Sequence, residues 1–279
     1  MKNNGLKKDN VIILLIFTIG LLVLLYPTLS NFVNEIHLRN TIKNYSQEVK
    51  STNDEEISAD IKAANDYNTD LINESVPESF AKRMGVKNDK EYESLLDVDG
   101  SGVMAYIDVP SIGVSLPIYH YTTTEILKNG AGHLFGSSLP VGGRNTHTVI
   151  TAHRGLPSAK MFTDLDQLEK GDKFFIKVLG KTLAYQVDHI KTVKPDETKE
   201  LGIVKGEDYT TLITCTPYGS NTHRLLVRGH RVPYVEGDED SETKHFHVPW
   251  NHIICVFIGI IVAVFLYFII KRIIVRKSM

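Results

Sequence analysis

Thr211-Leu-Ile-Thr-Cys215-Thr-Pro217, followed closely by Thr222-His-Arg-Leu-Leu-Val-Arg-Gly229, is the most informative stretch of this chain. Residues Tyr209 to Thr214 are rich in β-branched and aromatic side chains, so they predict a strand that ends at Cys215. A proline and a glycine follow directly and predict a turn. A second strand beginning at Arg224 would return beside the first and bring its guanidinium towards the thiol.

A similar pattern occurs upstream in Thr146-His-Thr-Val-Ile-Thr-Ala-His153-Arg-Gly155. Here too a β-rich run ends at a reactive side chain and is closed by a glycine. Cys215, His153 and Arg224, each near the end of a predicted strand, would make a nucleophile, an acid/base and an oxyanion partner.

The chain has only two cysteines, and they fall in different parts of it. Cys255 lies in an apolar run, where a thiol packs like a small hydrophobic side chain. Cys215 would therefore be the only cysteine in the folded segment between the two ends of the chain, a segment expected outside the cell. A single cysteine there excludes a disulfide framework. A buried structural cysteine is the alternative, but the strand-end position beside Arg224 and His153 favours a reactive thiol.

Two apolar runs predict membrane spans, Val11 to Tyr26 with extension to Phe32, and Ile253 to Ile270 behind Trp250. Lysine and arginine lie between each run and the nearer chain terminus. By the positive-inside rule, both termini are expected in the cytoplasm and the segment between the spans outside the cell. A cleaved signal peptide is the alternative for the first run, although no small-x-small site follows it. A buried core helix is the alternative for the second.

The net charge of −2 hides an uneven distribution, because the basic ends leave the middle portion at about −8. Nucleic-acid binding depends on basic surface, so we expect no nucleic-acid partner. His120, His133, His147 and His223 lack metal-ligand spacing and predict surface or hydrogen-bonded structural histidines rather than a metal site. We expect no metal and no cofactor.

Between the first span and about Leu96, apolar residues recur three and four apart, which predicts amphipathic helices. A disordered spacer is the alternative, because residues 46–73 are highly polar. The following region predicts a mainly β fold in which seven or eight short strands form a barrel or a sandwich. A helix is expected at Ser158 to Lys170. The predicted strands are Val103–Val109, Val114–Tyr121, Thr146–Thr151, Lys173–Val178, Thr182–Val193, Tyr209–Thr214 and Arg224–Val232.

These motifs together resemble the sortases, over roughly Val103 to Tyr234. The sequence around these motifs is similar to that of class C sortases, the pilin-polymerising branch of the family. The resemblance implies an eight-stranded β-barrel with the active site at one end of a groove. The segments that resemble class C are Leu139-Pro-Val-Gly-Gly143, His153-Arg-Gly-Leu-Pro157, Leu212-Ile-Thr-Cys-Thr-Pro-Tyr218 and Asn221-Thr-His-Arg-Leu-Leu-Val-Arg-Gly229.

Class C sortases commonly cover the catalytic cysteine with a lid that carries an Asp-Pro-aromatic motif. This sequence lacks that motif before the first barrel strand. Asp97, Val98 and Asp99 are the candidates for a reduced lid, in which an acid and an apolar side chain lie over the thiol. A plain glycine-rich turn is the alternative.

The resemblance implies a membrane-anchored cysteine transpeptidase that cleaves a Leu-Pro-x-Thr-Gly sorting signal through a thioester on Cys215. The implied partners are pilins or surface proteins carrying that signal, and an acceptor lysine of another pilin. A wall-anchoring sortase, a hydrolytic cysteine protease and a non-catalytic surface scaffold are the alternatives. The expected organisation is a tail (1–10), a span (11–29), a helical segment (30–96), a lid or turn (97–102), a catalytic barrel (103–235), a linker (236–249), a span (250–270) and a tail (271–279).

Overall fold

The structure is a computed structural model that describes residues 8–72, 89–241 and 259. The chain divides into two compact units, one formed by residues 1–33 and 247–279 and the other by residues 34–246. The second unit contains the barrel and all of the candidate site residues.

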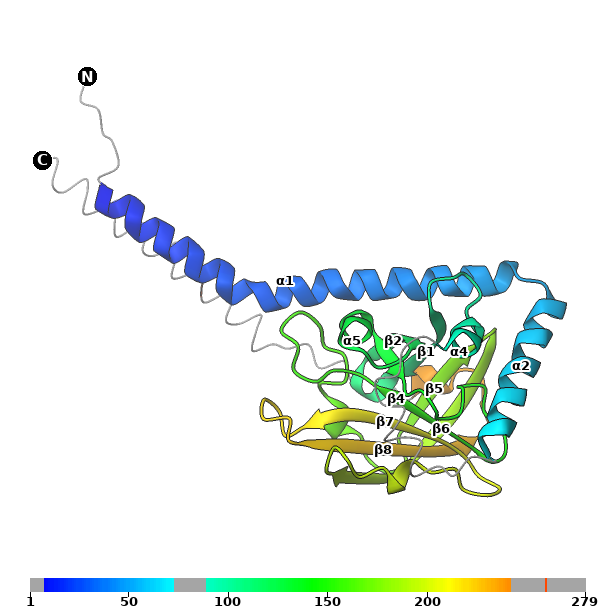
Figure 1. The fold of residues 1–279 in the computed structure, drawn as a ribbon. Coiled ribbons are helices and arrows are strands. Elements are labelled where there is room, and N and C mark those ends of the chain that lie inside the picture. Colours follow the sequence, from blue (N-terminus) through cyan, green and yellow to red (C-terminus); the bar gives the residue numbers. More distant parts are fainter. Residues whose placement is uncertain (1–7, 73–88, 242–258, 260–279) are drawn as a thin grey trace, which may run out of the picture. The chain divides into compact units, whose positions relative to one another are not determined.

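Eight strands form a closed barrel in the order β1-β2-β3-β4-β7-β8-β6-β5 (Figure 1). Most neighbouring strands are antiparallel, but β2 pairs with β3 and β4 pairs with β7 in parallel. The sequence left a barrel and a sandwich open, and the closed order shows the barrel. The strands are β1 Val103–Val109, β2 Val114–His120, β3 Ala131–His133, β4 Thr146–Thr151, β5 Lys173–Val178, β6 Lys181–Val193, β7 Asp208–Thr216 and β8 His223–Val232.

The seven strands predicted from the sequence are confirmed, with ends that agree to within two residues. The missed strand is β3, a three-residue strand with Gly132 at its centre. A Cβ at Gly132 would lie 2.2 Å from the backbone oxygen of Tyr121. The glycine is therefore there because two strands approach closely, and the same lack of a side chain removed the β signal from the sequence.

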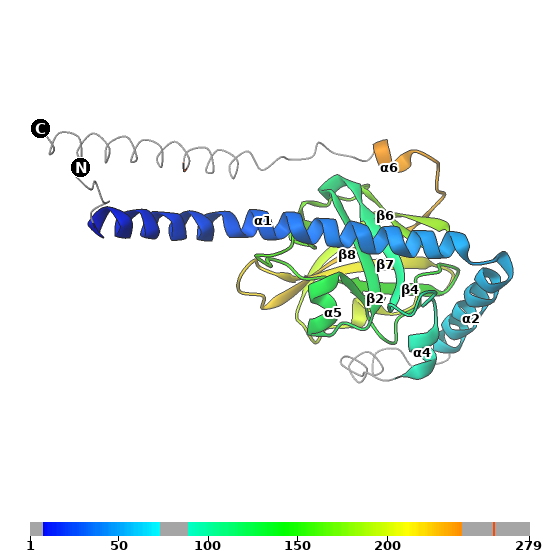
Figure 2. The same cartoon turned by 90° about the horizontal axis from the view of Figure 1, so that it is seen from above.

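Three helices precede the barrel; the part of the first from residue 34 on runs along the barrel, and the second crosses one end of it (Figures 1 and 2). They are α1 Lys8–Ser51, α2 Asp54–Ile72 and α4 Lys90–Ser94. On α1, the Tyr45 hydroxyl donates to the Met104 carbonyl at 3.1 Å and accepts from the Leu179 amide at 3.0 Å. On α2, Asn68 exchanges two hydrogen bonds with the Leu139 backbone. The helices expected before the barrel are thus present and packed on it, rather than forming a spacer.

The short helix α4 is held by a fully buried side chain. The Tyr92 hydroxyl lies 2.7 Å from Nδ1 of His133, and its ring packs edge-on against Phe135 at 4.8 Å between centroids. The remaining short elements are η1 Pro110–Ile112, α5 Thr124–Asn129, η2 Leu165–Gln167, η3 Lys199–Leu201 and α6 Asp238–Ser241.

The helix expected at Ser158 to Lys170 is wrong, because the segment forms turns with only the single 3₁₀ turn η2. Met161 has φ of 44°, in the left-handed region that interrupts a right-handed helix. The apolar residues that suggested the helix are nevertheless buried, so their spacing reported burial rather than helical geometry. They are Met161, Phe162, Leu165 and Leu168.

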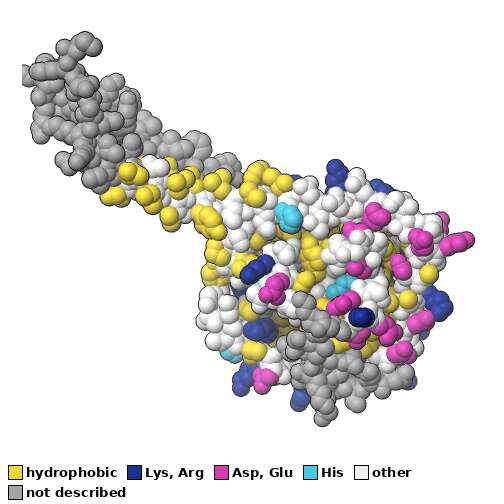
Figure 3. Space-filling model, turned by 45° about the horizontal axis from the view of Figure 1, so that its top comes forward, with side chains coloured by type: hydrophobic (Ala, Val, Ile, Leu, Met, Phe, Trp, Pro, Cys, Tyr) yellow, Lys and Arg dark blue, Asp and Glu magenta, His cyan; other side chains and the backbone are white. Residues whose placement is uncertain are grey.

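Residues 15–33 of α1 are mostly apolar and largely exposed, and Figure 3 shows hydrophobic side chains gathered along this part of the helix. In the described part of the chain, one helix is long and apolar enough to cross a bilayer, over Leu15–Ser51. This agrees with the first expected span in place and composition. Of the expected linker, residues 236–241 are described and include α6, whereas residues 242–249 lie outside the described part of the chain. The second expected span, apart from residue 259, and the last tail also lie outside it.

Candidate active site

Cys215 and Arg224 face each other across the antiparallel pair β7 and β8. They are direct register partners, one position from the end of the ladder at Thr216 and His223. Side chains of register partners project from the same face of a sheet with their Cβ atoms about 5 Å apart. The structure therefore places Cys215 and Arg224 side by side on the two neighbouring strands that the sequence predicted.

His153 reaches the same edge from the other side of β7. The strand β4 runs parallel to β7 with Thr151 opposite Ile213. The pairing continues past the end of β4, because the Ala152 amide donates to the Ile213 carbonyl at 3.2 Å. The Thr214 hydroxyl then donates to the Ala152 carbonyl at 2.9 Å. His153 is consequently the next residue along, level with Cys215.

The side chains alternate so that these three groups share the outer face of the barrel. Leu212 and Ile150 point into the core and are fully buried. Residues one or three positions further on point the other way, because successive side chains of a strand lie on opposite faces. Cys215, His153 and Arg224 are all half-buried at this face, so the site is open to a substrate.

The imidazole of His153 is held in its neutral form near neutral pH. Burial lowers its pKa from the ordinary value, and the positive charge of Lys128 lowers it further. A neutral imidazole can accept a proton from a thiol and return it to a leaving amine. Within the described part of the chain, neither His153 nor Cys215 has a side-chain hydrogen bond, and such contacts often form only when substrate is bound.

Arg224 is oriented by the turn that precedes it. Its Nη1 donates to the carbonyls of Asn221 at 3.2 Å and His223 at 3.1 Å. Among the described residues, its Nε and Nη2 have no partner. A partly committed guanidinium beside a nucleophile can stabilise an oxyanion through its remaining donors.

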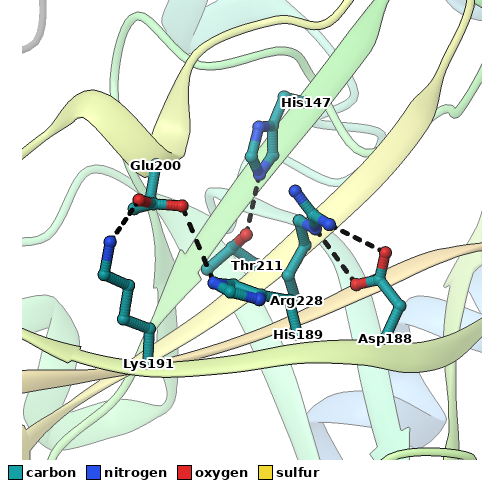
Figure 4. Close-up of polar contacts among 7 residues, drawn as sticks. All are labelled: His147, Asp188, His189, Lys191, Glu200, Thr211 and Arg228. Carbon is teal, nitrogen blue, oxygen red and sulfur yellow. Dashed lines mark hydrogen bonds and ion pairs between the residues drawn. The ribbon is translucent and has the colours of Figure 1, made fainter.

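A polar network beside this edge fixes the connection from β6 to β7 (Figure 4). Val193, at the end of β6, is the register partner of Arg224. Lys191 on β6 binds Glu200 of η3 at 2.5 Å. Nδ1 of His147 donates to the Gly202 carbonyl at 2.8 Å, so its Nε2 accepts from the Thr211 hydroxyl at 2.7 Å.

The rest of the network stiffens the sheet beneath the same connection. Arg228 forms two hydrogen bonds with Asp188, at 3.0 and 2.9 Å, and lies 4.2 Å from the ring centroid of Tyr209. Leu201 completes a small hydrophobic cluster with side chains of β4, β6, β7 and β8. The β6 to β7 connection is thus anchored directly beside Arg224.

The candidate lid residues lie elsewhere. Asp97 accepts from the Gly102 amide at 2.9 Å, and Asp99 from the Ser101 amide at 2.9 Å, so both stabilise their own turn. Asp97 and Val98 line a hollow of about 410 Å³ together with residues of α1 and α2. Both ribbon views show α2 and α4 at the end of the barrel away from the β7–β8 hairpin. The structure does not bring the lid candidates to the thiol, and their lid role stays an untested prediction.

Two further residues beside the site were not singled out from the sequence. Arg154 bonds Thr216, the neighbour of Cys215, at 3.2 Å. Gly155 has φ of 76°, and a Cβ there would lie 2.9 Å from the ring of Tyr218. Both directly follow His153 in the His-Arg-Gly segment. The motif therefore pointed to these positions, but the sequence did not show what Arg154 and Gly155 contact.

The histidines considered for a metal site have structural surroundings. His133 is fully buried and bonded to Tyr92 and Ser138, and His120 is bonded to the backbone of Leu95 and Gly102. Residues 8–72 and 89–241 contain no group of three or more potential metal ligands.

A closed barrel with a cysteine, a histidine and an arginine at the ends of adjacent strands defines a cysteine-dependent acyl-transfer enzyme. Residues 107–232 match the sortase domain. The chain is 44% identical to sortase C1 of Streptococcus agalactiae, with a TM-score of 0.63 over 70% of this chain and 100% of that structure. For sortase C-1 of Streptococcus pneumoniae the identity is 45% and the TM-score 0.64, over the same shares of the two chains.

Curated relatives agree with the solved structures. Sortase A of Listeria monocytogenes is 27% identical over 244 residues, which cover 86% of this chain and 98% of that protein. Sortase A of Bacillus anthracis is 29% identical over 135 residues, and the match spans only 62% of its length. The chain belongs to the sortase family, whose members are cysteine transpeptidases.

Proposed function

We propose that this protein is a membrane-anchored sortase that joins pilin subunits through isopeptide bonds. The observation that carries the proposal is the register pairing of Cys215 with Arg224, with His153 level with them on the neighbouring strand. The similarity to sortase C1 structures supports the pilin-polymerising branch of the family.

The reaction begins with attack on a Leu-Pro-x-Thr-Gly sorting signal. His153 accepts the thiol proton, and the sulfur of Cys215 bonds to the threonine carbonyl carbon. Arg224 stabilises the resulting oxyanion. The carbon–nitrogen bond to glycine then breaks, and His153 returns the proton to the leaving amine. The product is a thioester between the threonine carbonyl and Cys215.

Resolution requires a second nucleophile. The ε-amine of a lysine from another pilin attacks the thioester, the carbon–sulfur bond breaks and the thiol is regenerated. The proton lost by the amine passes to His153 or to the thiolate. A new isopeptide bond joins threonine to lysine, and the next pilin extends the polymer.

Membrane attachment fits this role. The exposed apolar part of α1 would anchor the enzyme in the bilayer, and a second span near the C-terminus would anchor its other end. Both tails would lie in the cytoplasm and the barrel outside. Anchoring beside membrane-tethered pilins raises their effective concentration at the site.

The test is to incubate the full chain in membranes with a pilin that carries the sorting signal. Covalent multimers that form with the wild-type enzyme and are absent with Cys215→Ala support the proposal. Replacing the acceptor lysine by arginine should abolish the multimers but not cleavage. Cleavage without multimers, with the product joined instead to a cell-wall amine, would favour a wall-anchoring sortase.

A further inference from the structure

We propose that Arg154 is a positioning residue that holds His153 beside Cys215 by joining the ends of β4 and β7. The inference deepens the proposed function, because it rests on the roles of His153 and Cys215 given above. It concerns the stretch beyond the last described backbone pairing between these strands, where the ladder itself no longer fixes the distance between the two reactive groups.

The side chain of Arg154 meets the end of β7 next to Cys215. Thr216 is the last residue of β7, and the alternation along that strand turns it away from the face that carries Cys215. Arg154 follows His153 in the bend after β4, and its guanidinium reaches the Thr216 hydroxyl. The contact therefore joins the immediate neighbours of the two reactive residues.

Two polar contacts make Arg154 a bridge between loops. Its Nη1 donates to the Thr216 hydroxyl at 3.2 Å. Its Nη2 donates to the carboxylate of Asp166 in η2, within the same loop as His153. The side chain of Arg154 is only 8% exposed, whereas that of Asp166 is 48% exposed. Desolvation disfavours a charge so deeply buried, and the two contacts offset part of that cost.

The shape of the guanidinium suits this position. Its planar fork presents donors in fixed directions, so one group reaches a partner on each side. An ammonium group at the same place would be a single point charge and would hold one partner well. The partners of Arg154 also separate it from Arg224, whose guanidinium bonds the carbonyls of its own turn at Asn221 and His223.

The loop behind His153 is held by hydrogen bonds of its own. The Phe162 amide donates to the His153 carbonyl at 3.0 Å, and the Gly155 amide donates to the Thr163 hydroxyl at 3.2 Å. Asp166 follows in the same folded segment. Holding Asp166 and Thr216 on one guanidinium thus fixes the backbone of His153 relative to that of Cys215.

The test is a double-mutant cycle on the full chain that combines Arg154→Gln with His153→Ala at pH 7. Two assays are made on each variant: the steady-state kinetics (kcat and KM) of transpeptidation with a sorting-signal peptide, and the rate of alkylation of Cys215 by iodoacetamide. We expect Arg154→Gln to lower kcat about 10- to 100-fold with KM within about twofold, the size of effect expected when a catalytic group is misplaced. We also expect alkylation to slow towards the rate of His153→Ala.

If Arg154 acts through His153, the double variant should be no slower than His153→Ala alone, because the two losses are not additive. Arg154→Lys should recover part of kcat. Thr216→Val and Asp166→Asn each remove one partner with less risk to folding, and each should give a smaller loss in the same direction. Asp164→Asn is the matched control, because Asp164 lies in the same loop but pairs with Lys160 at 3.0 Å.

Three results would overturn the inference. They are an unchanged kcat in Arg154→Gln, a loss that adds in full to that of His153→Ala, and partner variants that behave like Asp164→Asn. Failure of the proposed function looks different, since Cys215→Ala would then leave transpeptidation intact and His153→Ala would not slow alkylation of the wild-type thiol.

Discussion

Cys215 of β7 and Arg224 of β8 are direct register partners in an antiparallel pair, so sheet pairing sets the positions of the proposed nucleophile and the proposed oxyanion donor. A hairpin keeps this relationship without help from any other loop. His153, by contrast, lies beyond the end of β4, and we propose that the side chain of Arg154 helps to position it. The two relationships predict different responses to mutation.

Removing the guanidinium should damage the chemical step. We expect Arg224→Gln to lower kcat by about 10²-fold or more, because it removes a donor aimed at the developing oxyanion. Arg224→Lys should lose less, since it keeps the charge but not the fork. Steady-state transpeptidation of a sorting-signal peptide measures both. Arg231→Lys, at the other end of β8, is the control, and an Arg224→Gln enzyme as fast as that control would refute the role.

The acid limb of the pH profile should move when Lys128 is neutralised. Burial and then the charge of Lys128 lower the pKa of His153, so activity is retained down to a pH below the ordinary histidine range and is lost as His153 protonates. Lys128→Gln removes the second cause and should raise the pKa, shifting the limb of kcat/KM to higher pH. Lys181→Gln, an exposed lysine on β6, should leave it in place. A shift to lower pH, or none, would contradict the assignment.

Gly155 should be less replaceable than Gly219. Both have positive φ, of 76° and 83°, so alanine costs about 1 kcal/mol of backbone strain at either. At Gly155 the new Cβ would also press on the Tyr218 ring, whereas at Gly219 it meets nothing within 4 Å. Urea unfolding and kcat should both suffer more in Gly155→Ala. Adding Tyr218→Ala should recover the difference but not the shared strain, and no recovery would mean that the contact is unimportant.

Two buried histidines should make the fold sensitive to acid. Burial lowers the pKa of His133 and of His147 to about 4. The unfolded chain binds these protons at an ordinary pKa near 6.5, so stability is complete above that pH and is lost as pH falls towards 4. The loss reaches roughly 3 kcal/mol for each histidine by about pH 4. Urea midpoints measured from pH 7 to pH 4.5 should fall less in His147→Gln than in the wild type; an equal fall would contradict this.

The sequence was most informative where a local pattern and a backbone rule coincide. β-branched runs closed by glycine or proline predicted seven strands, and these placed Cys215, His153 and Arg224 near strand ends. The missing strand and the wrong helix have a common physical cause. In β3 and in the segment around Met161, contacts with residues far away in the sequence determine the backbone conformation. A periodic pattern over a few neighbouring residues contains no information on those contacts.

The contacts around the site could not be read from the chain for a related reason. Arg154 meets Thr216 across 62 positions of sequence, and the spacing gives no sign of which face of the strand either occupies until the pairing of β4 with β7 is known. The anchoring of η3 by Lys191 and His147 likewise needs the barrel order. Side-chain alternation becomes informative only after the register is fixed.

The most direct test of the account is the covalent state of Cys215. The full chain is mixed with a peptide carrying the sorting signal and its intact mass is measured, first without amine and then with a lysine peptide. We predict an adduct on Cys215 that ends at the threonine, is absent in Cys215→Ala, and is converted to a threonine–lysine isopeptide when the amine is added. No adduct, or an adduct released only by water whatever amine is present, would contradict it.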